Sequence, residues 1–196
     1  MGLEANKFMG KSYYFKDGEK YTGKIEILSD KNKEVKITGF LEDGVCSGEW
    51  YYFDDKGNTE MIETYEYGEL NGMFILFYPN GNIKEIGMMK QDKKHGTWYN
   101  YYFNGNIKYE NHYVFDIQTD GVWKEYTEDG YLLKKCPVMH GKLNGICVEY
   151  DKSGTVRRTC FIRDGLKNGD EISYDYNKRE VEKLRYVNGV EVEKIL

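Results

Sequence analysis

The chain has 196 residues, a formal net charge of −5 at pH 7 and an aromatic content of 16%, with 19 tyrosines and two prolines. An acidic balance argues against non-specific binding to nucleic acid, so no nucleic-acid partner is expected. No stretch approaches the roughly 18 apolar residues that a membrane span needs, so none is expected. The printed chain starts without a leader, which predicts a cytoplasmic protein, or a secreted one if a native signal peptide was removed.

Residues 1–22 are predicted to form a partial repeat that caps the N-terminal end of the chain. Tyr13, Tyr14 and Phe15 precede a turn signal at Asp17-Gly18. Aromatic residues favour strands, and an Asp-Gly pair favours a tight hairpin turn. A cap is expected here because the terminal strand of an array would otherwise expose unpaired backbone groups.

Residues 23–196 are predicted to form one continuous repeat domain. A glycine recurs every 24 or 25 residues along it, at Gly23, Gly48, Gly72, Gly96, Gly121, Gly145 and Gly169. Self-similarity at a fixed short period indicates an array of small units rather than a conventional globular core.

Each unit alternates strand-like runs with turn residues. The fifth residue after each repeat glycine is always apolar or aromatic, and a second glycine follows four residues later in most units, at Gly57, Gly81, Gly105, Gly130 and Gly154. We interpret these as structural turn glycines, since hairpin turns need the positive φ that glycine tolerates. The expected fold is all-β, an elongated single-layer antiparallel array of about seven hairpins. Residues 178–186 also have helix-compatible spacing, but the repeat register favours a strand there.

Charge is uneven along the chain. Residues 42–69 contain nine acidic residues against Lys56 alone, whereas residues 157–167 contain four basic residues and one acidic residue. Solvated strand faces explain both runs. The alternative is an acidic surface toward the N-terminal end that docks a basic partner.

The four cysteines are Cys46, Cys136, Cys147 and Cys160. Cys136 and Cys160 occupy the same position in consecutive units, so they should lie two strands apart, roughly 9.6 Å, beyond the roughly 7 Å that a disulfide spans. Cys147 lies on the strand between them and could approach either one. Free thiols and a reducing compartment are the expectation.

No arrangement of residues indicates catalysis. His95 and His140 each precede a glycine in a hairpin connection, and no nucleophile motif accompanies them. The regular glycines are turn glycines rather than a phosphate-binding loop. The sequence predicts no enzyme activity, no cofactor and no metal site.

An aromatic row occupies the second position after the repeat glycines, at Trp50, Phe74, Trp98 and Trp123. One interpretation is a stacked ladder that stabilises the sheet. The other is a groove for a partner segment, because aromatic residues anchor interfaces. The predicted partner-binding residues on this second interpretation are Trp50, Tyr51, Trp98, Tyr99 and Trp123.

The repeat resembles a known family. His95-Gly96-Thr97-Trp98 followed by Tyr101, and the runs at 80–85 and 104–108 that begin Asn-Gly-Asn-Ile-Lys, are similar to the second variant of the MORN repeat. This variant is found in bacterial proteins often labelled YwqK-type antitoxins. The resemblance implies an array of β-hairpins used for contacts with proteins and sometimes lipids.

The sequence therefore predicts a non-catalytic scaffold that binds an unidentified protein partner. Two alternatives follow: an antitoxin that neutralises a toxin, suggested by the resemblance alone, and a secreted or surface factor that contacts host or envelope components.

Overall fold

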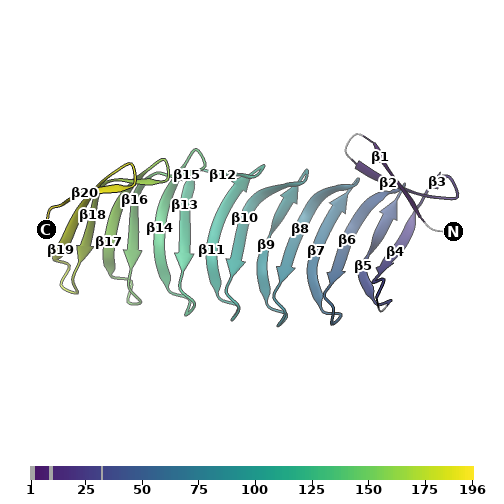
Figure 1. The fold of residues 1–196 in the computed structure, drawn as a ribbon, viewed down its shortest axis with the longest axis horizontal. Helices are drawn as coiled ribbons and strands as arrows, with labels where there is room; N and C mark the ends of the chain where they lie inside the picture. Colours follow the sequence, from purple (N-terminus) through teal and green to yellow (C-terminus); the bar gives the residue numbers. More distant parts are fainter. Residues whose placement is uncertain (1–2, 9–10, 32) are drawn as a thin grey trace. The chain divides into compact units, whose positions relative to one another are not determined.

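The computed structural model describes residues 3–8, 11–31 and 33–196, and all of its regular secondary structure is β. The chain divides into two compact units, residues 1–96 (unit 1) and 97–196 (unit 2), and β10 (Lys93–Tyr101) contains their boundary. Within the sheets of both units, strands pair antiparallel with their neighbours in the chain (Figure 1). The predicted all-β hairpin meander is confirmed.

Unit 1 consists of a small sheet followed by a six-stranded meander. The small sheet comprises β1 (Glu4–Phe8), β2 (Lys11–Lys16) and β3 (Glu19–Lys20). The meander comprises β4 (Gly23–Leu28), β5 (Val35–Glu42), β6 (Val45–Phe53), β7 (Thr59–Glu66), β8 (Glu69–Phe77) and β9 (Ile83–Lys90). The strands β1, β2 and β3 thus form a sheet of their own, and the Tyr14 amide donates a hydrogen bond to the Gly44 carbonyl at 2.7 Å.

Unit 2 continues the same pattern. Its main strands are β11 (Ile107–Val114), β13 (Gly121–Tyr126), β14 (Leu132–Met139), β16 (Gly145–Tyr150), β17 (Val156–Arg163), β18 (Leu166–Tyr174), β19 (Glu180–Val187) and β20 (Val190–Lys194). The short strands β12 (Ile117–Gln118) and β15 (Lys142–Leu143) pair with β11 and β14. Residues 180–187, for which the sequence also allowed a helix, are a strand.

The turns at the two ends of each hairpin have different structural roles. The second glycines of the repeat, Gly57, Gly81, Gly105, Gly130 and Gly154, have φ between 79° and 90°. That conformation is strained for other residues, which explains glycine at these turns. At the other end, turn glycines bond to the preceding repeat: the Gly68 amide donates to Cys46 O and the Gly165 amide to Leu143 O, both at 2.9 Å. Successive hairpins are therefore joined at their turns as well as through their strands.

Candidate functional site

Successive residues of a strand point to opposite faces of its sheet, so each unit has two faces. In unit 1 we call the face that carries Ile25 and Trp50 the inner face, and the face that carries Tyr51 and Ile62 the outer face. In unit 2 the inner face is the one that carries Cys136 and Cys147.

The inner face of unit 1 is closed by Trp50. This residue is 4% exposed and packs with Ile25 and Leu41. Its ring covers Gly39, where an added Cβ would lie 2.3 Å from Trp50 Cδ2. Tyr65 meets the indole edge-on, with ring centroids 5.8 Å apart. Gly39 therefore makes the space that the tryptophan fills.

A carboxylate lies beside this tryptophan, held by two phenols. Tyr52 Oη and Tyr65 Oη both donate to Glu63 Oε2, at 2.7 and 2.8 Å. Burial is the main cause that raises the pKa of both tyrosines, and it raises the pKa of the nearby Cys46 thiol to about 11. All three groups stay protonated at neutral pH, so the two phenols hold the carboxylate in place and the thiol is not a nucleophile.

The predicted aromatic groove does not lie on one face. Trp50 and Trp98 are buried, at 4% and 1% exposure, and Trp123 is half-buried and stacks on Tyr109 with centroids 5.8 Å apart. Tyr51 and Tyr99 are the next residues along their strands, so they point to the opposite face from their neighbouring tryptophans. The burial favours the interpretation of the tryptophans as structural, and of the predicted residues of unit 1 only Tyr51 lies on the outer face.

The outer face of unit 1 carries a continuous apolar row. Tyr51 lies directly opposite Ile62, Ile62 opposite Ile75, and Ile75 opposite Ile86, so four adjacent strands contribute to it. We call these four residues the isoleucine row. Beside it, Met73 and Met88 lie opposite one another and are 46% and 47% exposed. Exposed apolar side chains beside a registered apolar row are typical of an interaction surface rather than of a solvated sheet face.

Carboxylates and a hollow border the isoleucine row. By strand alternation the exposed Glu42, Glu49, Glu60 and Glu66 all lie on this outer face. Tyr51 Oη donates to Glu49, and this bond raises the pKa of the phenol.

A hollow of about 420 Å³ adjoins Ile62 and is lined also by Phe77 and Pro79. The outer face thus combines apolar anchoring positions with an acidic surround.

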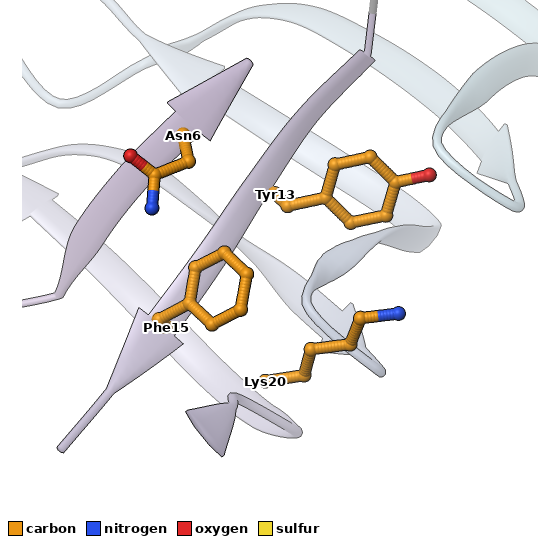
Figure 2. Close-up of a pocket in the computed structure, with 4 residues that line it drawn as sticks. All are labelled: Asn6, Tyr13, Phe15 and Lys20. Carbon is orange, nitrogen blue, oxygen red and sulfur yellow. The ribbon is translucent and has the colours of Figure 1, made fainter. Parts of the chain in front are cut away.

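A second hollow lies in the small sheet at the N-terminal end. It measures about 390 Å³ and is lined by Asn6, Tyr13, Phe15 and Lys20 (Figure 2). Lys20 Nζ lies 5.2 Å from the centroid of the Tyr13 ring. An aromatic floor beside an ammonium and an amide could accept an apolar group that carries an anion, but all four side chains come from a small surface sheet.

Unit 2 carries charge at several of the positions that the isoleucine row occupies in unit 1, at Glu110, Lys124, Lys135 and Lys183, and keeps Tyr99, Val148 and Ile172 at others. Glu110 pairs with Lys124 at 3.1 Å, and on the inner face Glu149 lies between Lys134 at 3.0 Å and Arg158 at 3.7 Å. Such pairs hold neighbouring strands together. Apolar side chains are also exposed in this unit, at 44% for Val122 and 59% for Ile146.

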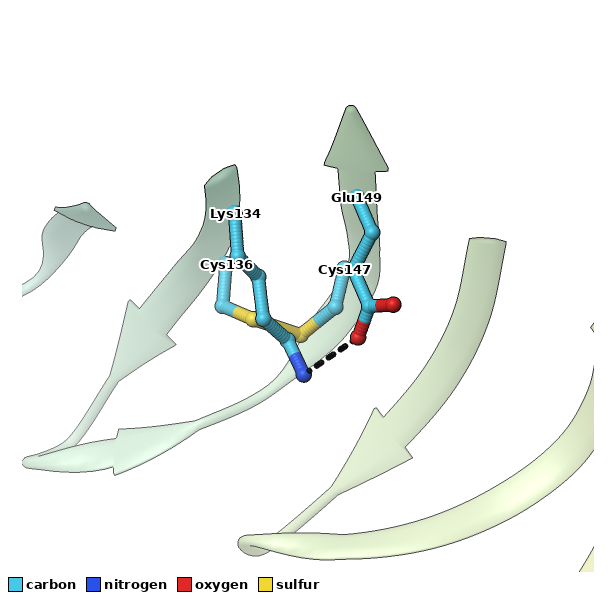
Figure 3. Close-up of a disulfide and its surroundings, with 4 residues drawn as sticks. All are labelled: Lys134, Cys136, Cys147 and Glu149. Carbon is cyan, nitrogen blue, oxygen red and sulfur yellow. Dashed lines mark hydrogen bonds and ion pairs between the residues drawn. A yellow bond between two sulfur atoms is a disulfide. The ribbon is translucent and has the colours of Figure 1, made fainter. Parts of the chain in front are cut away.

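The prediction of four free thiols was wrong. Cys136 and Cys147 form a disulfide between β14 and β16, next to the Lys134–Glu149 ion pair (Figure 3). Their Cα atoms are 4.2 Å apart because the two residues lie directly across one strand pair. Cys46 and Cys160 are free. The reducing compartment that was inferred from free thiols loses its support.

The isoleucine row was missed at the sequence level, although a signal for it exists. Its members occupy the third and fourteenth positions after the repeat glycines Gly48 and Gly72. The equivalent positions after Gly121 are Lys124 and Lys135, so only a comparison of repeats distinguishes the apolar stretch.

Within the described ranges, no cluster of three or more His, Cys, Asp or Glu side chains is arranged to hold a metal ion. The same part of the chain contains no helix long and apolar enough to span a membrane.

Comparison with protein families identifies the MORN repeat variant at two adjacent repeats, residues 70–91 and 94–114. These segments overlap β8, β9, β10 and β11, and the first of them carries Ile75 and Ile86 of the isoleucine row. A comparison with curated proteins finds no match.

Proposed function

We propose that this chain is a non-catalytic protein-binding module, and that the outer face of unit 1 binds a partner segment whose apolar side chains are flanked by Lys or Arg. The observation that carries the proposal is the isoleucine row, which four strands hold in register beside Met73 and Met88. The MORN repeat match supports an interaction role, since such repeats generally serve as binding modules.

The two parts of this surface have different tasks. Burying Met73 and Met88, each nearly half exposed, would supply binding free energy of about 25 cal/mol for every Å² of apolar area removed from water. The exposed Glu42, Glu49, Glu60 and Glu66 add little free energy each, but they favour a basic partner and speed its encounter with the surface.

Binding can be tested with defined peptides. A seven-residue peptide of alternating Leu and Lys should bind the full chain at least about tenfold more tightly than the matched Leu–Glu peptide, a difference of about 1.4 kcal/mol. Fluorescence anisotropy of labelled peptides measures this ratio, and raising the salt concentration should reduce it because exposed charges are screened.

Variants locate the binding surface. Met73→Glu combined with Met88→Glu should weaken binding of the Leu–Lys peptide at least about tenfold, because it places two charges within the apolar surface. The matched control is Ile146→Glu in unit 2, where a 59% exposed apolar residue is replaced and binding should not change. Equal weakening by both variants, or equal affinity for the two peptides, would contradict the proposal. Binding to phosphatidylcholine–phosphatidylserine vesicles without peptide binding would replace it with a lipid-contact function.

Toxin neutralisation is one form that such binding could take, with the toxin as the basic partner. It stays a prediction, as do the compartment of the protein and its role as a scaffold.

A further inference from the structure

Three cysteines form a row across three adjacent strands of unit 2. Cys136 on β14 lies across from Cys147 on β16, and Cys147 lies directly opposite Cys160 on β17. All three are on the inner face and belong to one buried cluster, at 0%, 1% and 4% exposure. A disulfide and a free thiol are therefore immediate neighbours within one buried cluster.

We propose that this row is a site of internal thiol–disulfide exchange, in which the disulfide moves between the pairs Cys136–Cys147 and Cys147–Cys160. Cys160 loses its proton and its sulfur attacks the sulfur of Cys147. The Cys147–Cys160 bond forms as the Cys136–Cys147 bond breaks, and Cys136 leaves as a thiolate that takes up a proton. One disulfide and one thiol are present before and after, so no external oxidant or reductant is needed.

The register supplies the geometry. Directly opposite residues of an antiparallel pair have Cα atoms about 4.5–5.5 Å apart, which permits a disulfide between Cys147 and Cys160 as well as the existing one. The row runs straight across the strands, so Cys160 approaches Cys147 from the side opposite Cys136, the leaving sulfur. Cys136 and Cys160 are two strands apart, roughly 9.6 Å, and cannot pair directly. Cys147 is consequently shared by both isomers.

The groups that surround Cys160 set the rate of thiol–disulfide exchange. Burial raises the pKa of the Cys160 thiol. The charged groups around it are Lys134 on β14, Glu149 on β16, and Lys167 and Glu171 on β18; the two lysines lower this pKa and the two carboxylates raise it. Because the thiolate is the attacking species, exchange should be slow at neutral pH and about 30-fold faster at pH 8.5 than at pH 7.0.

Peptide mapping tests the proposal on the full chain. Trypsin cleaves after Lys135, Lys142, Lys152 and Arg158, which puts the three cysteines on three separate peptides. The chain, with Cys46→Ser to remove the remaining thiol, is held under air at pH 7.0 or 8.5, trapped with N-ethylmaleimide in acid and digested without reduction. Mass spectrometry should find both Cys136–Cys147 and Cys147–Cys160 linkages, with Cys136 alkylated in the second isomer. Finding only Cys136–Cys147, or no linkage at either pH, overturns the proposal.

Two variants distinguish exchange within the folded cysteine row from disulfide scrambling in an unfolded chain. Circular dichroism verifies that each variant keeps its β-structure. In the same background, Cys136→Ser should form the Cys147–Cys160 linkage. Cys147→Ser should form none, because the remaining cysteines are too far apart. A folded Cys136→Ser chain in which both thiols stay free overturns the proposal, and so does a Cys136–Cys160 linkage in Cys147→Ser. If Cys136→Ser does not fold, the proposal is decided by whether peptide mapping finds both disulfide isomers in the parent chain.

Discussion

At equivalent positions of the repeat, unit 1 and unit 2 carry different side chains, and the two are stabilised in different ways. The central inner position is Trp50 in the Gly48 repeat of unit 1, where it is buried over Gly39, and Cys147 in the Gly145 repeat of unit 2, where it is bonded to Cys136. The first repeats of unit 2 keep Trp98 and Trp123 at this position. On the outer face, the position of Ile75 in unit 1 is occupied by Lys124 in the Gly121 repeat of unit 2, and the position of Ile62 by Lys135. One repeat backbone thus accepts an aromatic core with an apolar outer face, or a covalent link with ion pairs.

The largest expected effect concerns the aromatic core of unit 1. Trp50→Ala should lower the free energy of unfolding by about 3–5 kcal/mol, because it leaves a cavity over Gly39. Denaturant unfolding followed by circular dichroism measures the loss. Met73→Ala, on the outer face, should change stability by about 0.5 kcal/mol or less. Similar losses from the two substitutions would show that the inner face is not the core of this unit.

A reductant should affect the units differently. The disulfide closes a loop with a sequence separation of 11, and in a chain-entropy account a loop of this size contributes about 2–3 kcal/mol. Dithiothreitol should therefore accelerate hydrogen exchange in residues 132–163 and leave residues 45–66 unchanged. A Cys136→Ser, Cys147→Ser double variant serves as control and should not respond. Equal acceleration in both segments would end the distinction between the units.

The smallest expected effect is acid sensitivity in unit 2. Hydrogen bonds from Arg185, and then from Lys183, lower the pKa of Asp170 from its ordinary 3.8 to about 2. A carboxylate with a depressed pKa contributes stability that is fully present above pH 4 and is lost as the pH falls toward 2. The stability difference between the parent chain and Asp170→Asn should accordingly shrink from pH 5 to pH 2. Arg185→Gln should weaken the same dependence, and a difference that stays constant with pH would show that these contacts do not act on Asp170.

The fold was predictable because its signals are local. Glycine spacing, strand-favouring residues and Asn-Gly or Asp-Gly pairs each indicate hairpins within a dozen residues, and the structure places strands and turns where they indicate. The site was less predictable. Trp50 and Tyr51 are adjacent in the sequence and were grouped together, yet alternation puts them on opposite faces.

The sequence by itself determined the period, the hairpins and the turn glycines, because these depend on backbone conformations available to only a few residue types. The tertiary structure decided which residue lies opposite which, and so which side chains are buried, exposed or bonded. Register shifts such as the one between Glu63 and Tyr65 change the pairing along a strand. For this reason only the assembled sheet could show that Cys147 meets both Cys136 and Cys160, and that Ile62, Ile75 and Ile86 form one row.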